Sequence, residues 1–265
     1  MDKIIKDTFE FNSKLDSSLV IKDDNGNTAI PILWFGDLEA YRKSPIKILT
    51  VGINPSDIEF KNNKGGIELN FRFPDSTEID LNNPDYQKKY TDILNGYFKK
   101  DEGHHPYMRW FNKNESALNG LGASYFSGSS KLTSIHIDLR APIATPIKWS
   151  DIEKYNIDEF NPGIGIFNRL VNELQPDIML MPISIDQHIA KVFGKMDWED
   201  LGYGYLKLSR VKLDSKKDCV LINGSNDRVG PFMKGVESLS LLTENFKKIK
   251  KKLQNEGMNF PPLND

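Results

Sequence analysis

The sequence predicts an α/β fold: one domain in which a central, mostly parallel four-stranded sheet lies between two layers of helices. Segments of strand character alternate with segments of helical spacing along the chain, which is the order typical of a parallel sheet. The strand-like segments are mostly apolar rather than polar at every second residue, as expected of strands that are buried on both faces.

Four segments are predicted to be the strands. Each is short, rich in apolar residues and bounded by Gly, Pro or polar residues, which are typical limits of a strand. They are residues 46–51 (IKILTV), 132–139 (LTSIHIDL), 177–183 (DIMLMPI) and 219–223 (CVLIN).

Four helices are predicted between and after these strands. Two begin at an Asn-Pro pair, Asn83-Pro84 and Asn161-Pro162, because Asn caps a helix and Pro suits its first turn. A third spans residues 184–193 and ends before Gly194. The fourth, residues 239–253, is amphipathic and rich in lysine.

The amino-acid composition excludes several classes of protein. The 265 residues include 35 Lys and Arg against 37 Asp and Glu, and 38% are hydrophobic, which argues against disorder and against a strongly basic nucleic-acid binder. A single cysteine, Cys219, excludes a disulfide within the chain and a four-cysteine metal site. No apolar run approaches the roughly 18 residues of a membrane span, and the first residues lack a signal peptide's apolar core. We expect a cytoplasmic monomer without membrane contact.

Polar residues follow all four predicted strands. They are Gly52-Ile53-Asn54-Pro55-Ser56, His136-Ile137-Asp138, Ser184-Ile185-Asp186-Gln187 and Asn223-Gly224-Ser225-Asn226-Asp227-Arg228. Because ligands bind at the carboxyl ends of parallel strands, we expect these residues to form one site.

This ordered set of strand ends resembles the uracil-DNA glycosylase superfamily. The first motif of that family, Gly-x-Asp/Asn-Pro, reads GINP here, and the last, His/Asn-Pro-Ser, reads NGS. The order of the motifs agrees, and the resemblance covers the chain from Pro45 to the final helix. Residues 1–44 lie outside it, and Gly224 stands where the family usually has proline.

The resemblance implies a glycosylase fold and catalysis by Asn54 and Asn223, with Gly52, Ile53 and Pro55 beside the substrate. Hydrolysis of a base–sugar bond passes through an oxocarbenium-like sugar and needs a placed water. The side-chain carbonyl of Asn54 can orient that water, and Asn223 can donate to the leaving base. Neither metal nor cofactor is expected. The alternative is an ordinary turn, because Gly, Asn and Pro dominate turns.

A base in a duplex must leave the stack to reach such a site. The resemblance makes Phe71 the ring that stacks on the flipped base, with Phe60 and Phe73 as rivals, and a place in the core is the alternative for Phe71. The side chain that fills the gap left in the duplex by the flipped base is expected to be that of Asp227, Arg228 or Val229. We favour Arg228, because a guanidinium group both stacks on bases and binds phosphate, although an exposed loop arginine is the commoner explanation for any single arginine.

Three further residues are predicted to contact DNA. Ser184 and Gln187 lie at a helix start, where phosphate binds, and Ser225 follows the last strand. Serine with glutamine three residues later is also a capping box, so Ser184 and Gln187 have a purely structural explanation as well.

Asp138 stands where the family reads the base with an asparagine, and His136 lies on the same face of the strand. An ionised carboxylate only accepts hydrogen bonds, so Asp138 matches the N4 amino group of a cytosine-type base and repels O4 of uracil. A buried, protonated Asp138 would instead donate to O4. A structural carboxylate that caps the following loop is the third possibility.

The function we predict is that of a monofunctional DNA glycosylase. It flips a uracil-like or modified base, with 5-substituted cytosine as one option, and hydrolyses the N-glycosidic bond, for base-excision repair or for defence against modified phage DNA. Two alternatives stay open: a catalytically silent member of the fold that binds DNA or protein, and a hydrolase of free nucleosides or nucleotides.

Overall fold

The computed structural model describes residues 1–99, 105–126, 132–155, 157–184, 186–225 and 230–262. The chain forms two compact units, and it crosses between them repeatedly. Unit 1 comprises Met1–Gly36, Ile53–Tyr107 and Ile137–Glu173, whereas unit 2 comprises Asp37–Gly52, Met108–His136 and Leu174–Asp265.

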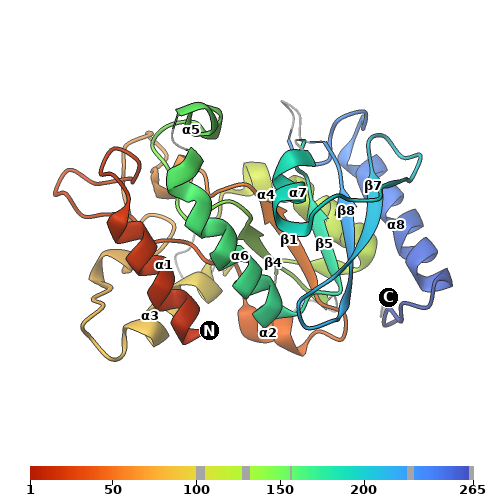
Figure 1. Ribbon diagram of the computed structural model, residues 1–265, viewed down its shortest axis with the longest axis horizontal. Helices are drawn as coiled ribbons and strands as arrows, with labels where there is room; N and C mark the ends of the chain where they lie inside the picture. The colour runs from red at the N-terminus through yellow and green to blue at the C-terminus, as the bar shows by residue number, and fades with distance from the viewer. Residues whose placement is uncertain (100–104, 127–131, 156, 185, 226–229, 263–265) are drawn as a thin grey trace. The chain divides into compact units, whose positions relative to one another are not determined.

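The main sheet has six strands in the order β4-β1-β5-β8-β7-β6 (Figure 1), and all of them except the second half of β4 belong to unit 2. Strands β1 (Ile48–Gly52), β5 (Ile178–Met181) and β8 (Asp218–Asn223) pair in parallel. Every residue of β1 and β5 is buried, which explains why these segments are mostly apolar, with Thr50 as the one polar residue. The predicted mostly parallel sheet is therefore confirmed.

The predicted number of strands is wrong, because the sheet has two more. Strands β7 (Lys207–Lys212) and β6 (Glu199–Asp200) extend it antiparallel beyond β8. Strand β7 reads KLSRVK, with exposed and half-buried charges between its apolar residues. An antiparallel strand with one face partly in water carries such polar residues, so a search for continuous apolar runs does not detect it.

The predicted strand at residues 132–139 is two strands. Strand β3 (Leu132–Thr133) pairs in parallel with β2 (Ala123–Ser124) in a separate small sheet. Strand β4 (Ile135–Asp138) joins the main sheet. Ser134 lies between them, and its backbone N–H donates to the carbonyl of Ser124.

The described residues of unit 2 form four α-helices. They are α2 (Leu38–Lys43), α4 (Met108–Leu121), α7 (Asp186–Phe193) and α8 (Leu239–Asn255). Helices α4 and α8 pack closely, and a Cβ atom at Gly120 would lie 2.5 Å from the carbonyl of Thr243. Among the described residues, none of the helices combines the length and the apolar character that crossing a membrane requires.

Unit 1 is built around helices α1 (Asp2–Lys14), α3 (Tyr86–Gly96), α5 (Trp149–Tyr155) and α6 (Asn161–Leu174). Phe9 of α1 packs edge-on against Tyr90 of α3 at 4.9 Å, and Phe11 packs against Phe160. Pro142 accepts the N–H of Ile32. Residues 1–36 thus belong to the core of unit 1, although the family resemblance does not reach them.

The predicted helix at Asn83-Pro84 begins later than expected. Helix α3 starts at Tyr86, and the side chain of Asn83 accepts the backbone N–H of Asp85 at 2.9 Å. Asn83 therefore closes a turn before the helix, which is the other structure that asparagine stabilises.

Two glycines of α6 offer a matched test of packing. A Cβ atom at Gly163 would lie 2.0 Å from the carbonyl oxygen of Arg140, whereas a Cβ atom at Gly165 meets nothing within 4 Å. We expect Gly163→Ala to lower the free energy of unfolding by about 1–3 kcal/mol through overpacking. Gly165→Ala should raise it by about 0.5–1 kcal/mol, because alanine favours the helix. Denaturant titrations of both variants test this, and equal effects would contradict the tight fit at Gly163.

Candidate functional site

The GINP motif forms the turn that follows β1. Gly52 is the last residue of the strand and is buried, as is Pro55, while Ile53 and Asn54 are half-buried. The carbonyl of Ile53 accepts the backbone N–H of Arg140 at 2.8 Å. In unit 1 the segment after β1 therefore lies against the segment that follows β4.

The side chain of Asn54 is held by three oxygen atoms. Its amide nitrogen lies 3.0 Å from the carbonyl of Pro55, and 3.5 Å from both the carbonyl of Ile143 and Oγ1 of Thr145. Three acceptors around one atom assign that atom as the NH₂ group. The carbonyl oxygen of Asn54 is left as the atom that can accept a hydrogen bond from a ligand.

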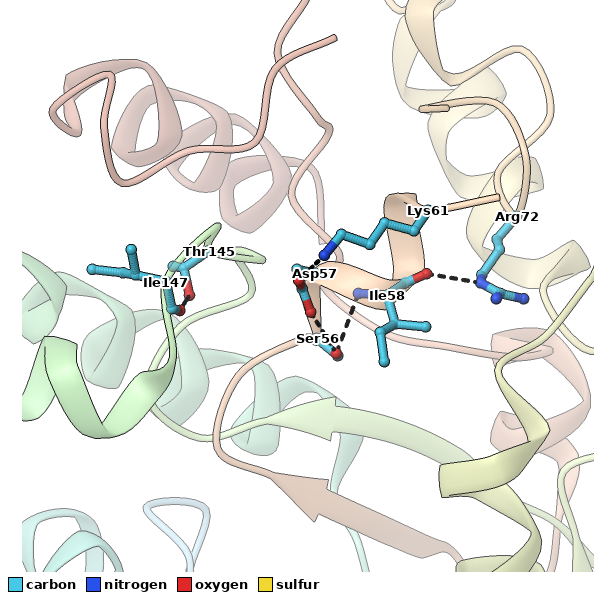
Figure 2. A network of polar contacts seen from close by, with 7 residues as sticks. All are labelled: Ser56, Asp57, Ile58, Lys61, Arg72, Thr145 and Ile147. Carbon is cyan, nitrogen blue, oxygen red and sulfur yellow. Dashed lines mark hydrogen bonds and ion pairs between the residues drawn. The ribbon is translucent and has the colours of Figure 1, made fainter. Parts of the chain in front are cut away.

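Asn54 lines a pocket of about 410 Å³ in unit 1. The other lining residues come from the segment after β1, from the loop before α5 and from the first residue of α5; they are Pro55, Ser56, Asp57, Thr145, Pro146, Ile147, Lys148 and Trp149. Figure 2 shows Asp57 paired with Lys61, and Thr145 donating to the carbonyl of Ile147. Such a volume lies in the usual range of small-ligand sites.

Hydrogen bonds within the turn hold one wall of this pocket. Oγ of Ser56 accepts the backbone N–H of Ile58 at 3.2 Å and caps the short 3-10 helix η1 (Asp57–Phe60). Arg72 then donates from Nε to the carbonyl of Ile58 at 3.0 Å (Figure 2). The predicted motif and the segment around Phe71 are therefore joined through η1.

Phe71 is a half-buried ring, whereas its rivals Phe60 and Phe73 are fully buried in the core. The ring of His105 stacks on Phe71, with 5.1 Å between centroids and 20° between planes. The guanidinium of Arg72 lies 5.2 Å from the same ring. Of these three aromatic residues, Phe71 is the one whose ring is partly exposed to solvent, and His105 covers one face of that ring.

His136 and Asp138 are both buried, at 2% and 5% exposure. Nδ1 of His136 lies 2.8 Å from Oγ1 of Thr50, which in turn lies 2.5 Å from the hydroxyl of Tyr125. The ring of Phe111 packs edge-on against His136. These contacts give His136 a structural role within unit 2, and its contact with a substrate stays a prediction.

Asn223 ends β8 and is 5% exposed. Its side-chain oxygen accepts the backbone N–H of Ile183 at 3.4 Å. This contact turns the side-chain oxygen of Asn223 toward the backbone of the segment that follows β5.

The neighbours of residue 224 explain why glycine stands at this position. A Cβ atom at Gly224 would lie 2.4 Å from Cδ1 of Phe232 and 2.9 Å from Cδ2 of Leu206. The backbone N–H of Gly224 donates to the carbonyl of Met181 at 3.3 Å. Proline, which the family resemblance leads one to expect here, lacks that N–H and has no room.

The residues predicted to contact DNA have different surroundings. Ser184 is exposed and precedes α7 by two residues, Gln187 is exposed in its first turn, and Ser225 is half-buried after β8. Arg228, with its neighbours Asp227 and Val229, lies outside the described residues.

The sequence patterns do not identify two buried residues of unit 1 that have ionisable side chains. Glu59, in η1, is 2% exposed, and Arg140 is 0% exposed. Among the described residues, no hydrogen-bond partner lies beside the guanidinium nitrogens of Arg140. Burial lowers the pKa of Arg140, and the charge of Glu153 opposes that shift. Glu59 and Arg140 each lie within six residues of a predicted motif, and this proximity is the one feature of the sequence that could have drawn attention to them.

Among the described residues, no three His, Cys, Asp or Glu side chains are grouped so that they could hold a metal ion. A comparison with models of known protein families finds no match for the chain. A comparison with curated proteins likewise finds none. The site is therefore interpreted from its own geometry.

Proposed function

We propose that the protein is a monofunctional DNA glycosylase, which extrudes a base from DNA and hydrolyses its N-glycosidic bond. The observation that carries the proposal is the orientation of Asn54. Three oxygen acceptors fix its NH₂ group and leave its carbonyl oxygen, beside a pocket, to accept from a water molecule. A water held in this way can attack the sugar as the base departs.

Three further observations support this function. Asn223, buried at the end of β8, carries an amide, and an amide donor beside a leaving base would stabilise the charge that develops on it in the transition state. Phe71, with Arg72 beside it, offers a half-buried ring for stacking. Lys148 adds a cation to the lining of the Asn54 pocket, where Lys61 offsets the charge of Asp57. The three-layer arrangement of a uracil-DNA glycosylase belongs to this proposal.

The test is incubation with duplex and single-stranded oligonucleotides that carry different bases, followed by alkaline cleavage at abasic sites. Cleavage that depends on one base supports the glycosylase. Binding of DNA without cleavage would favour the catalytically silent alternative. Release of free base from nucleosides alone would favour a nucleoside hydrolase, for which the pocket beside Asn54 is large enough.

Asp138 is the residue we propose to select the base. It ends β4 and is buried, so a hydrogen-bonding mismatch with the base is not relieved by water. A charged Asp138 favours a 4-amino pyrimidine over uracil by about 1–3 kcal/mol, or roughly 5- to 150-fold. A cytosine with an additional 5-substituent is the proposed substrate, since excision of ordinary cytosine would damage the host's own DNA.

Asp138→Asn should therefore shift the preference toward uracil, because an amide can donate to O4. Rates of base release from oligonucleotides with uracil and with 5-substituted cytosines, measured for wild type and variant, give the ratio directly. Glu68→Gln, at an exposed carboxylate of unit 1, is the control. Efficient uracil release by the wild type, unchanged in Asp138→Asn, would contradict a role for Asp138 in base selection and would indicate an ordinary uracil-repair enzyme.

A further inference from the structure

Two tyrosines of unit 2 each lie beside a lysine from another segment of the chain. Both belong to the turn between β6 and β7; Tyr205 is 51% exposed, and Tyr203 is half-buried. Nζ of Lys234 lies 4.3 Å from the ring centroid of Tyr205, and Nζ of Lys248, on α8, lies 5.1 Å from that of Tyr203. Because the two rings are two residues apart in one turn, the four side chains form one surface, which we call the Tyr205 surface.

A backbone hydrogen bond and close packing fix the turn that carries the two rings. The backbone N–H of Leu206 donates to the carbonyl of Tyr203 at 3.2 Å. Gly204 has a φ of 64°, and a Cβ atom there would lie 3.3 Å from the carbonyl oxygen of Lys234. The turn and the segment around Lys234 are thus packed together, which places the ring of Tyr205 and its lysine side by side in the folded protein.

Among the described residues, no carboxylate forms an ion pair with the ammonium group of Lys234 or of Lys248. Lys247 and Lys252, also on α8, do form such pairs. The exposed Glu237 follows Lys234 by three residues and lowers the net charge of this part of the chain. Two ammonium groups are therefore available to an anionic ligand, and charge alone gives a moderate attraction.

The Tyr205 surface lies at the end of the sheet that holds Asn223. Strand β7 begins directly after the turn, beside β8 (Figure 1), and its first residue pairs with Asn223, the last residue of β8. The segment that carries Lys234 also reaches this end, since a Cβ atom at Gly224 would lie 2.4 Å from Cδ1 of Phe232. A ligand bound to the surface is therefore close to the carboxyl end of β8.

A single strand of DNA matches this combination of groups. Ammonium groups attract its phosphates, and bases that are free of a duplex stack on aromatic rings. A duplex offers phosphates but keeps its bases stacked on one another, and a chain of carboxylates has no base to stack.

We propose that the Tyr205 surface binds single-stranded DNA near Asn223, with bases on Tyr205 and Tyr203 and phosphates on Lys234 and Lys248. The inference rests on the proposed function for the use of this strand as a substrate. Binding of the strand itself requires no base release, so the two can be tested separately.

The first experiment measures binding by fluorescence anisotropy, with a short labelled strand of ordinary bases and with the matching duplex. The single strand should bind more tightly than the duplex. Tyr205→Ala should weaken binding of the single strand about fivefold or more, because a stacked base loses its ring. Tyr205→Phe keeps the ring and should keep the wild-type affinity.

The salt dependence of this binding tests the two lysines. The double variant Lys234→Gln, Lys248→Gln should reduce the slope of log affinity against log salt concentration by about 1.4, since each phosphate contact of a single strand contributes about 0.7. Lys212→Gln is the matched control, because Lys212 lies at the opposite end of β7 from the turn, and its slope should equal that of the wild type. All of these variants should unfold at the wild-type temperature.

The possible results separate the surface from the proposed function. Equal affinity for single strand and duplex, wild-type affinity in Tyr205→Ala, or an unchanged slope in the double variant overturns the surface. Polyglutamate that binds more tightly than the strand, and equally to wild type and Tyr205→Ala, also overturns it and would indicate an acidic protein partner. Strand binding as expected, together with no base release from any DNA, would reject the glycosylase and leave the surface intact.

Discussion

Asn54→Ala is expected to reduce the rate of base release by about 100-fold or more and to leave the affinity for DNA almost unchanged. The loss follows from removing the carbonyl oxygen that orients the attacking water, and an oriented polar group of this kind contributes about that much to a rate. Single-turnover kinetics on an oligonucleotide with the preferred base measure the rate, and a gel-shift titration measures the affinity.

Two control variants make this experiment specific. Thr145→Val removes one of the three oxygens around the NH₂ group of Asn54 and should give an intermediate loss. Asn82→Ala removes an exposed amide that contacts only the turn at Asp80 in the described structure, and it should have no effect. An Asn54→Ala variant that keeps more than about a third of the wild-type rate would exclude Asn54 from the chemistry.

The stability of the protein should fall as the pH rises from about 4.5 to about 8, because of Glu59. Burial raises the pKa of Glu59 from 4.5 to about 8, so between these values the folded chain binds a proton that the unfolded chain has released. The stabilisation is complete below pH 4.5 and is lost as the pH passes 8. The shift corresponds to about 5 kcal/mol at most.

The contribution of Glu59 is isolated by comparison with Glu59→Gln, which cannot titrate. The contribution of Glu59 to the free energy of unfolding, measured by urea titrations at pH 5, 7 and 9 as the difference between wild type and Glu59→Gln, should fall by about 4 kcal/mol from pH 5 to pH 9. Glu68→Gln, at an exposed carboxylate, should run parallel to the wild type. Parallel curves for Glu59→Gln and wild type would mean that Glu59 is charged in the folded protein.

The parallel centre of the sheet could be predicted from the sequence because its strands are buried on both faces. A strand that is buried along its whole length is mostly apolar, as β1 and β5 are. Strand β7 has one face partly in water and therefore mixes Lys and Arg with Leu and Val, so its pattern carries less information. Helix α4 was missed for a similar reason: its buried residues include Asn114 and Gly120, which no apolar pattern selects.

The candidate site likewise has a part that the sequence predicts and a part that it does not. The turn at Asn54 and the end of β8 at Asn223 are marked by Gly, Asn and Pro, which are local signals. The surroundings of Glu59 are not local: its hydrogen-bond donor, Tyr97, is 38 residues away. A glutamate on a short polar segment is ordinarily exposed, and only the folded chain shows that this one is buried.

The pairing of β1 also has a consequence for how the chain folds while it is being made. Ile48 of β1 pairs with Ile178 of β5, 130 residues later, and the neighbour on the other side of β1 begins only at Ile135. A ribosome adds about 5–20 residues per second, so β1 waits roughly 7–26 seconds for β5 after its own synthesis. Until β4 begins to be made, roughly 4–17 seconds after Ile48 at the same rate, this buried strand has no neighbour in the main sheet, and chaperones that shield nascent chains are expected to matter for the yield of this protein.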